Sequence, residues 1–183
     1  ILDRAYFLAG RHQGFDIRVH NPELIMDQVA SGQGCLLLGA HFGSFEVLRT
    51  LAVDKQRLPL KVLMRREHNA VMTRLLDQLN PGVSETVIPL GGPTSLLQVN
   101  EALERGEMVG ILGDRLVENG KLVHCRFFGE STAFPAGPVL LAASLRVPVI
   151  LFFGVYRGGN RYDVHFELLA RGISIPREQR EAG

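Results

Sequence analysis

"CLLLGAHFGSFEVL", residues 35–48, decides the fold, because it holds an apolar strand, a turn and the start of a helix. The run 35–40 is apolar throughout, and such uninterrupted strands are typical of sheets that are covered on both faces. From residue 45 to 53 the apolar residues recur at helical spacing. A strand that leads through a short turn into a helix is the first part of a β–α–β unit, so the stretch predicts an α/β fold.

The same alternation of strand and helix patterns continues along the chain. Strands are expected at 16–20, 35–40, 60–64, 85–90, 108–112, 121–128, 148–155 and 161–169. Helices are expected at 1–10, 22–30, 45–53, 68–79 and 95–105. The range 135–145 is expected to be a loop followed by a helix that ends at residue 145. Asn21 is expected to cap the second helix, with Pro22 at its first position. The pattern predicts one α/β domain over residues 1–183, with a mostly parallel central sheet, helices on both faces and an antiparallel edge near the C-terminus.

Length and charge restrict the class of protein. The 183 residues suit one domain with a sizeable core. The formal net charge is +1, from 20 basic and 19 acidic residues, so no overall field favours a nucleic-acid partner. Cys35 and Cys125 lie in apolar runs, and we expect buried free thiols in a reducing compartment rather than a disulfide.

The sequence shows no targeting or membrane-spanning segment. A signal peptide pattern is absent from the start of the sequence. The most apolar stretch, 139–155, is interrupted by Arg146 and Pro148, so it does not read as a spanning helix of about 20 apolar residues. Because the sequence starts at Ile1 and stops in a polar segment, we expect a domain truncated at both ends, with any membrane anchor outside it.

Polar groups follow four of the expected strands. In open α/β sheets, ligands bind beyond the carboxyl ends of the strands. If these strands are parallel, one edge of the sheet collects the groups that follow them: His41, Arg65, Gly91-Gly92 and Asp114-Arg115. The sequence therefore predicts a site at that edge.

His41 and Glu46 are the strongest catalytic candidates. A neutral imidazole can take a proton from a hydroxyl near pH 7, and a carboxylate can orient its other ring nitrogen. Within one helix an offset of five places two residues ~140° apart, so pairing requires His41 in the turn and Glu46 in the first helical turn. Gly43 allows close backbone approach there, and Gly43-Ser44-Phe45 lacks the second glycine of a nucleophile elbow. The alternative is a helix-capping histidine beside a solvated glutamate.

Each of the other groups that follow the expected strands has two interpretations. Arg65-Arg66 is either an anion site or a solvated strand end. Asp114-Arg115 is either an internal ion pair or a substrate contact, and Gly91-Gly92-Pro93-Thr94 is either a phosphate site or a helix start capped by Thr94.

Patterns typical of other ligands do not appear. His68, His124 and His165 show no metal-ligand spacing, so we expect no metal, and nucleotide fingerprints are missing. The pairs Phe127-Phe128 and Phe152-Phe153 are expected in the core.

The assembled pattern resembles the bacterial lipid A biosynthesis (lauroyl/myristoyl-type) acyltransferase family, relatives of the glycerolipid acyltransferases. His41-Phe42-Gly43-Ser44-Phe45-Glu46 resembles the family's H-x4-E signature. Arg65 and Asn69 in "MRREHN" are similar to its arginine block, and Gly113-Asp114-Arg115 to its aspartate block. The stretch 127–150 is also similar, so the likeness runs from about residue 34 to 169.

The resemblance implies a glycerolipid-acyltransferase-like fold and an O-acyltransferase. The acyl donor would be an acyl carrier protein thioester or acyl-CoA, and the acceptor a hydroxyl of a lipid or glycolipid. His41 would be the general base and Glu46 its orienter. The substrate-binding residues would be Arg65, Asn69, Asp114, Arg115, Gly43 and Ser44. No metal or other cofactor is expected.

The resemblance also implies a location and leaves alternatives open. The protein would contact the cytoplasmic face of the bacterial inner membrane, peripherally or through an anchor outside this segment. A thioester hydrolase and a non-catalytic lipid-binding domain of the same fold are the alternatives.

Overall fold

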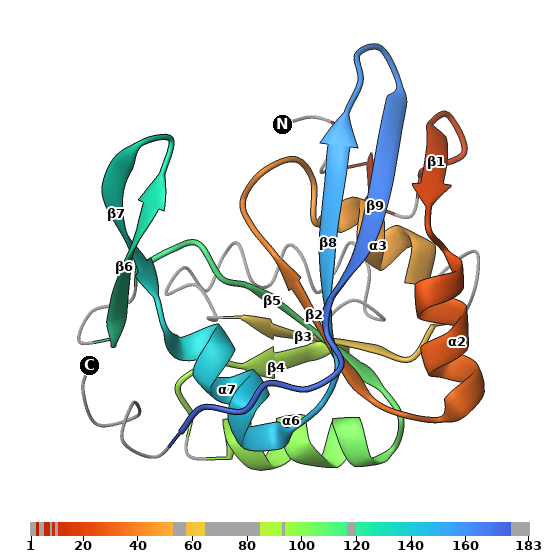
Figure 1. Ribbon diagram of the computed structural model, residues 1–183. Coiled ribbons are helices and arrows are strands. Elements are labelled where there is room, and N and C mark those ends of the chain that lie inside the picture. The colour runs from red at the N-terminus through yellow and green to blue at the C-terminus, as the bar shows by residue number, and fades with distance from the viewer. Residues whose placement is uncertain are drawn as a thin grey trace.

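The computed structural model describes residues 3, 6–7, 9, 11–52, 58–64, 85–92, 94–116 and 120–176. Its main feature is a seven-stranded sheet in the order β1-β9-β8-β2-β5-β3-β4 (Figure 1). The strands of this sheet are β1 (Asp16–His20), β2 (Cys35–Gly39), β3 (Leu60–Met64), β4 (Val87–Pro89), β5 (Met108–Leu112), β8 (Val149–Tyr156) and β9 (Arg161–Ala170). The order confirms a mixed α/β fold.

Most neighbouring strands are parallel. β8, β2, β5, β3 and β4 all run in one direction, so their carboxyl ends lie at the same edge. β9 is antiparallel to β8, as expected near the C-terminus. β1 is the edge strand and pairs in parallel with β9. The predicted convergence of strand ends is therefore confirmed for β2, β3, β4 and β5.

Helices cover both faces of the sheet. Alternate residues of each buried strand point to opposite faces, so Cys35 and Leu37 enter one core cluster and Leu36 enters the other. The first cluster contains Ile25 of α2 (Glu23–Ser31) and Leu48 of α3 (Glu46–Thr50). The second cluster contains side chains of α6 (Ser95–Glu104) and α7 (Gly137–Leu145).

The structure describes little of two predicted helices and differs from one predicted cap. The expected helix 68–79 lies outside the described residues, and only residues 3, 6 and 7 of the first are described as helical. Asn21 does not cap α2: its side-chain amide donates instead to the Phe166 carbonyl of β9, at 2.9 Å, and the N-cap position falls on Pro22. The side chain thus ties the helix start to the sheet.

None of the described helices is long and apolar enough to cross a bilayer.

A hairpin that the sequence did not predict projects from the sheet (Figure 1). β6 (Leu122–Phe127) was expected, but the residues after it form a second strand, β7 (Glu130–Pro135), antiparallel to β6. Phe127, Phe128 and Cys125 are exposed, so the expected burial of these residues is wrong. Cys35 is buried, as expected, and both thiols are free.

Candidate functional site

β2 and β5 are neighbouring parallel strands, and their register places His41 and Asp114 side by side. Gly39 pairs with Leu112 at the ends of the strands. His41 and Asp114 each follow two residues later, and the Gly113 amide donates to the Gly39 carbonyl between them. The alignment therefore brings the His41 and Asp114 side chains together.

The Asp114 carboxylate holds His41 with two hydrogen bonds. The His41 backbone amide donates to Asp114 Oδ2 at 2.9 Å, and ring atom Nδ1 lies 2.8 Å from Oδ1. An ionised carboxylate only accepts hydrogen bonds, so Nδ1 carries a proton, and in the neutral imidazole Nε2 is then the nitrogen with the free lone pair. The His41 side chain is 36% exposed, so a ligand can reach it. This arrangement is suited to general-base catalysis at Nε2.

The contact with His41 also sets the pKa of Asp114. Partial burial raises the pKa of the carboxyl, but the hydrogen bonds from the His41 ring and amide, with the charge of that ring, lower it by more. The net pKa lies below the ordinary value of 3.8. Asp114 is therefore ionised at neutral pH, as the orienter of an imidazole must be.

The turn that carries His41 is docked on β8. Gly43 has φ +84° and forms a bridge with Gly154, and the Ser44 amide donates to the Gly154 carbonyl at 2.7 Å. A Cβ on Gly43 would lie 2.0 Å from that carbonyl oxygen, so only glycine fits. The close backbone approach predicted for Gly43 is confirmed. Because the Ser44 amide is already bonded, it does not serve as an oxyanion donor.

Glu46 lies in the first turn of a helix, the position that pairing with His41 requires. His41 is in the turn, and Glu46 is the first residue of α3, as predicted. Its backbone carbonyl accepts from Thr50 Oγ1 at 3.0 Å, and its charge makes the smallest contribution to the raised pKa of Tyr162, after burial, Asp3 and Tyr156. The group that the structure places on His41 Nδ1 is Asp114, so orientation of His41 by Glu46 stays a prediction.

Asp114 does not pair with Arg115. One of the two interpretations of these residues, an internal ion pair, is wrong: Asp114 bonds to His41, and within the described ranges Arg115 is exposed and makes no ion pair. Arg115 is thus a cation available beside the His41–Asp114 pair. Arg65 and Asn69 lie outside the described residues, and their substrate-binding roles stay predictions.

At the end of β4, the hydroxyl that organises the helix start belongs to Ser95 and not to Thr94. Thr94 occupies the N-cap position of α6 without a side-chain bond. Buried Ser95 accepts from the Gly92 amide at 2.9 Å, and its single hydroxyl proton lies within reach of two acceptors, the backbone carbonyls of Gly92 and Pro89. Because the Gly92 amide is used in this way, it is not available for a phosphate.

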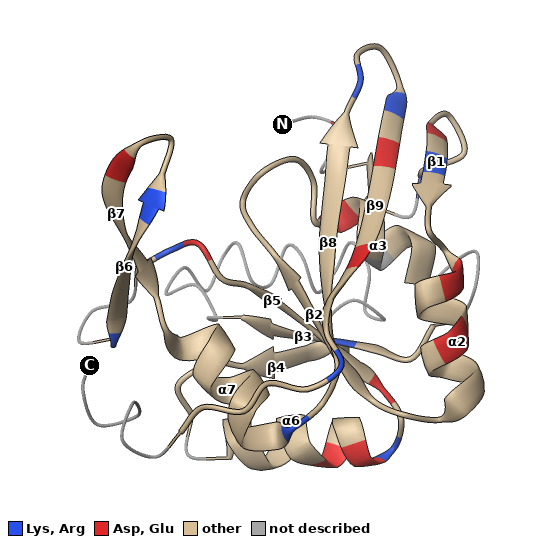
Figure 2. Ribbon diagram, viewed as in Figure 1, with Lys and Arg blue, Asp and Glu red and all other residues tan. Residues whose placement is uncertain are grey.

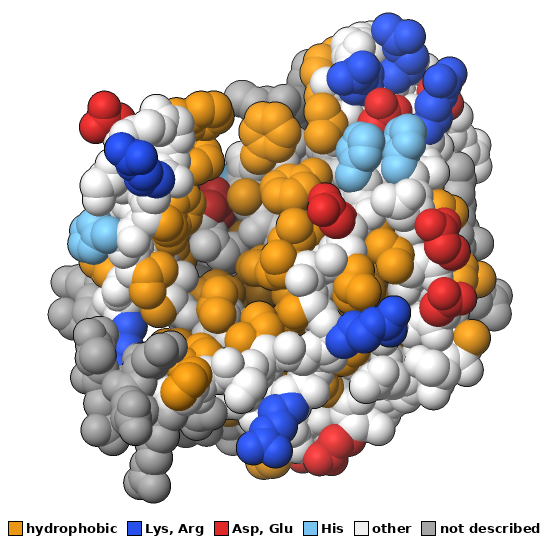
Figure 3. Space-filling model, in the orientation of Figure 1, with side chains coloured by type: hydrophobic (Ala, Val, Ile, Leu, Met, Phe, Trp, Pro, Cys, Tyr) orange, Lys and Arg blue, Asp and Glu red, His pale blue; other side chains and the backbone are white. Residues whose placement is uncertain are grey.

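Apart from Arg115, the described elements around the pair are mostly apolar. β2, β5 and α7 carry no charged residue, whereas charges gather on β1, β9 and α2 (Figure 2). Figure 3 shows a hollow between the β6–β7 hairpin and the β8–β9 hairpin, lined mainly by hydrophobic side chains. The flanking segments expose large apolar residues, among them Phe42, Leu116 and Val139. This surface suits a ligand with hydrocarbon chains.

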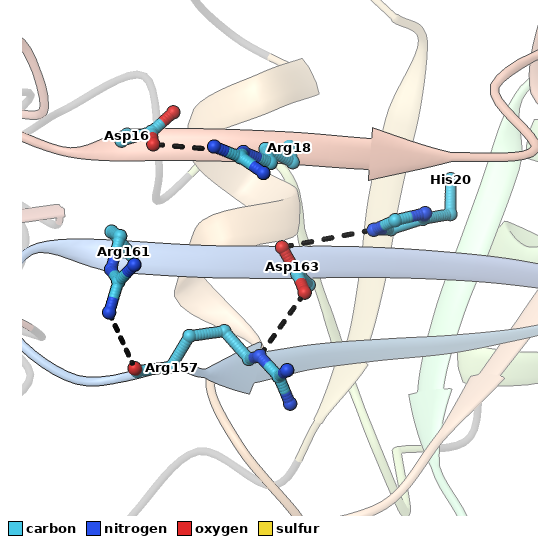
Figure 4. A network of polar contacts seen from close by, with 6 residues as sticks. All are labelled: Asp16, Arg18, His20, Arg157, Arg161 and Asp163. Carbon is cyan, nitrogen blue, oxygen red and sulfur yellow. Dashed lines mark hydrogen bonds and ion pairs between the residues drawn. The ribbon is translucent and has the colours of Figure 1, made fainter.

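A second polar cluster lies on β1 and β9. Figure 4 shows Asp163 between His20 and Arg157, with the His20 Nε2 to Asp163 Oδ1 distance at 3.8 Å and the Arg157 Nε to Asp163 Oδ2 distance at 3.3 Å. The rings of His20 and His165 stack 4.3 Å apart. His20, Asp163 and His165 could hold a metal by residue type, with ligand atoms within 4.8 Å. Sequence spacing missed this cluster, because it depends on the register of His20 with His165.

Comparison with known proteins gives one family. A family profile described as "Bacterial lipid A biosynthesis acyltransferase" matches residues 5–169. Comparison with curated proteins gave no match.

Proposed function

Since the chain belongs to the bacterial lipid A biosynthesis acyltransferase family, we propose that it transfers a fatty acyl group from a thioester to a hydroxyl of a lipid or glycolipid. The donor is an acyl carrier protein thioester or acyl-CoA. The proposal rests on one observation: Asp114 makes hydrogen bonds to both the backbone amide and the ring of His41. The proposed location of the enzyme is the cytoplasmic face of the bacterial inner membrane, where a lipid acceptor is within reach.

The proposed reaction balances without a cofactor. Nε2 of His41 takes the proton of the acceptor hydroxyl while its oxygen attacks the thioester carbonyl. The new C–O bond forms, the tetrahedral intermediate collapses, and the C–S bond breaks. The imidazolium returns the proton to the leaving thiolate, which gives an ester and a thiol. Asp114 keeps the required tautomer of His41 and stabilises its charged form.

The remaining predicted residues receive substrate roles in this proposal. Arg115, an exposed cation beside Asp114, binds an anionic group of the donor or acceptor, as does Arg65, and Asn69 contributes to substrate binding. Gly43 and Ser44 form the wall of the site at the turn. Glu46 supplies a second carboxylate at the start of α3 and supports His41.

A product assay tests the proposal against its alternatives. The protein is incubated with an acyl carrier protein thioester, with and without a lipid hydroxyl acceptor, and the products are identified by mass spectrometry. We expect acylated acceptor and free thiol. Free fatty acid formed at the same rate with or without acceptor would favour a thioester hydrolase. No turnover, with lipid still bound, would favour a non-catalytic lipid-binding domain.

A further inference from the structure

The tip of the β6–β7 hairpin exposes two adjacent phenylalanines. Phe127 is 51% exposed and Phe128 is 93% exposed. All six residues of β6 are exposed, and these include the apolar Leu122 and Val123. The described part of the fold therefore leaves the tip without a covering element, although each phenylalanine exposes a large apolar surface to water.

The backbone at the tip is unfavourable for the residue that it carries. The two-residue turn between β6 and β7 has φ +50° at Phe128 and +88° at Gly129. Turns with two positive φ values favour Asn-Gly, because bulky residues adopt this conformation poorly. Phe128 thus combines an unfavourable backbone with an exposed ring. Such an outlier points to a functional reason for the residue.

The aromatic rings form a small preassembled unit. Phe127 contacts Phe128 edge-on at a centroid distance of 4.5 Å and Phe134 at 5.5 Å. Arg126 precedes the two phenylalanines, Glu130 pairs with Phe127 across the hairpin, and both charged residues are exposed. Exposed aromatic rings flanked by solvated polar groups match the boundary between phospholipid headgroups and acyl chains.

The position of the hairpin relates this tip to the candidate site. β6 and β7 lie in the chain between Asp114 and α7, and the hairpin forms one wall of the apolar hollow (Figure 3). We propose that the tip formed by Phe127 and Phe128 enters the surface of a phospholipid bilayer. The hollow then opens toward the membrane, and a lipid acceptor reaches His41 from the bilayer. The choice of a bilayer as partner rests on the proposed lipid-acylating function.

The absence of tryptophan from the sequence permits a direct experiment. Phe128→Trp places a single fluorophore at the tip, and Leu97→Trp, at a 58% exposed site on α6, is the matched control. Each variant is mixed with vesicles of phosphatidylethanolamine and phosphatidylglycerol, with or without bromine in the acyl chains. We expect a blue shift and quenching by brominated lipid for residue 128, and neither for residue 97. Equal quenching of both, quenching at neither, or quenching at residue 97 alone would overturn the proposal.

A second pair of variants measures the contribution of the tip to binding. Phe127→Ser with Phe128→Ser is expected to weaken vesicle partitioning in a flotation assay by about tenfold or more. Leu96→Ser with Leu97→Ser removes exposed apolar surface from α6 and should leave partitioning unchanged. Equal loss in both double variants would contradict a specific role of the tip. These measurements need no substrate, so absent acyl transfer by the unsubstituted protein would overturn the proposed function and leave the membrane result standing.

Discussion

His41 and Asp114 lie 73 positions apart in the sequence and are joined by two hydrogen bonds, one to the backbone amide and one to ring atom Nδ1. The parallel pairing of β2 with β5 produces this contact, since each residue follows its strand end by two positions. The fold thus supplies the imidazole with a fixed tautomer before any substrate binds.

Glu46 is the carboxylate that the sequence motif selects, and a double-mutant cycle can establish its relation to Asp114. We expect Glu46→Gln to lower kcat strongly and the loss to be non-additive with that of Asp114→Asn, because both carboxylates serve one imidazole. Steady-state kinetics of the two single variants and the double variant provide the test. Fully additive losses would show that Glu46 acts on something other than His41.

The glycine contact between the His41 turn and β8 is expected to be essential for stability. Gly43→Ala places a methyl group against the Gly154 carbonyl at a positive φ, so we expect a loss of about 1–3 kcal/mol or more in the free energy of unfolding. Urea denaturation measures it. Gly137→Ala is the control, because nothing lies within 4 Å of its Cβ and it begins α7. A similar small effect of both substitutions would contradict the tight docking.

The lowered pKa of Asp114 predicts a pH dependence of stability. A carboxyl with a folded-state pKa below its unfolded value stabilises the fold above the unfolded value, and this contribution disappears as the pH falls through the folded value. The stability difference between the wild-type protein and Asp114→Asn should therefore be constant above about pH 5 and shrink below 3.8. Unfolding curves measured across this range test it. A difference that grows toward acid pH would have the wrong sign.

The two cysteines are expected to differ sharply in reactivity. Burial raises the pKa of the Cys35 thiol to about 12, whereas Cys125 is exposed on β6. Because the thiolate is the reactive form, a maleimide near pH 8 should label native protein once, at Cys125, and Cys35 only after unfolding. Mass spectrometry of wild type and Cys125→Ser identifies the labelled site. Rapid labelling of native Cys125→Ser would contradict the burial of Cys35.

Sequence patterns predicted the elements that local physics determines. The strands predicted from the apolar runs of β2, β3 and β5 are confirmed, because strands buried on both faces tolerate few polar residues. The contact of His41 with Asp114 was not predicted, since it depends on β2 and β5 being neighbours, which no local pattern encodes. The β6–β7 hairpin was missed because its turn carries Phe128 where Asn or Gly is usual. The functions of Arg65 and Asn69 stay predictions.

The most direct test of the account is acyl transfer by variants of the His41–Asp114 pair. Acylated lipid formed from an acyl carrier protein thioester is quantified by mass spectrometry for wild type, His41→Ala, Asp114→Asn and the control Asp163→Asn, whose carboxylate lies in the separate cluster on β9. We predict ~10²–10⁴-fold lower kcat for the first two variants and near wild-type rates for the control, with all proteins folded by circular dichroism. Wild-type turnover by His41→Ala would contradict the mechanism.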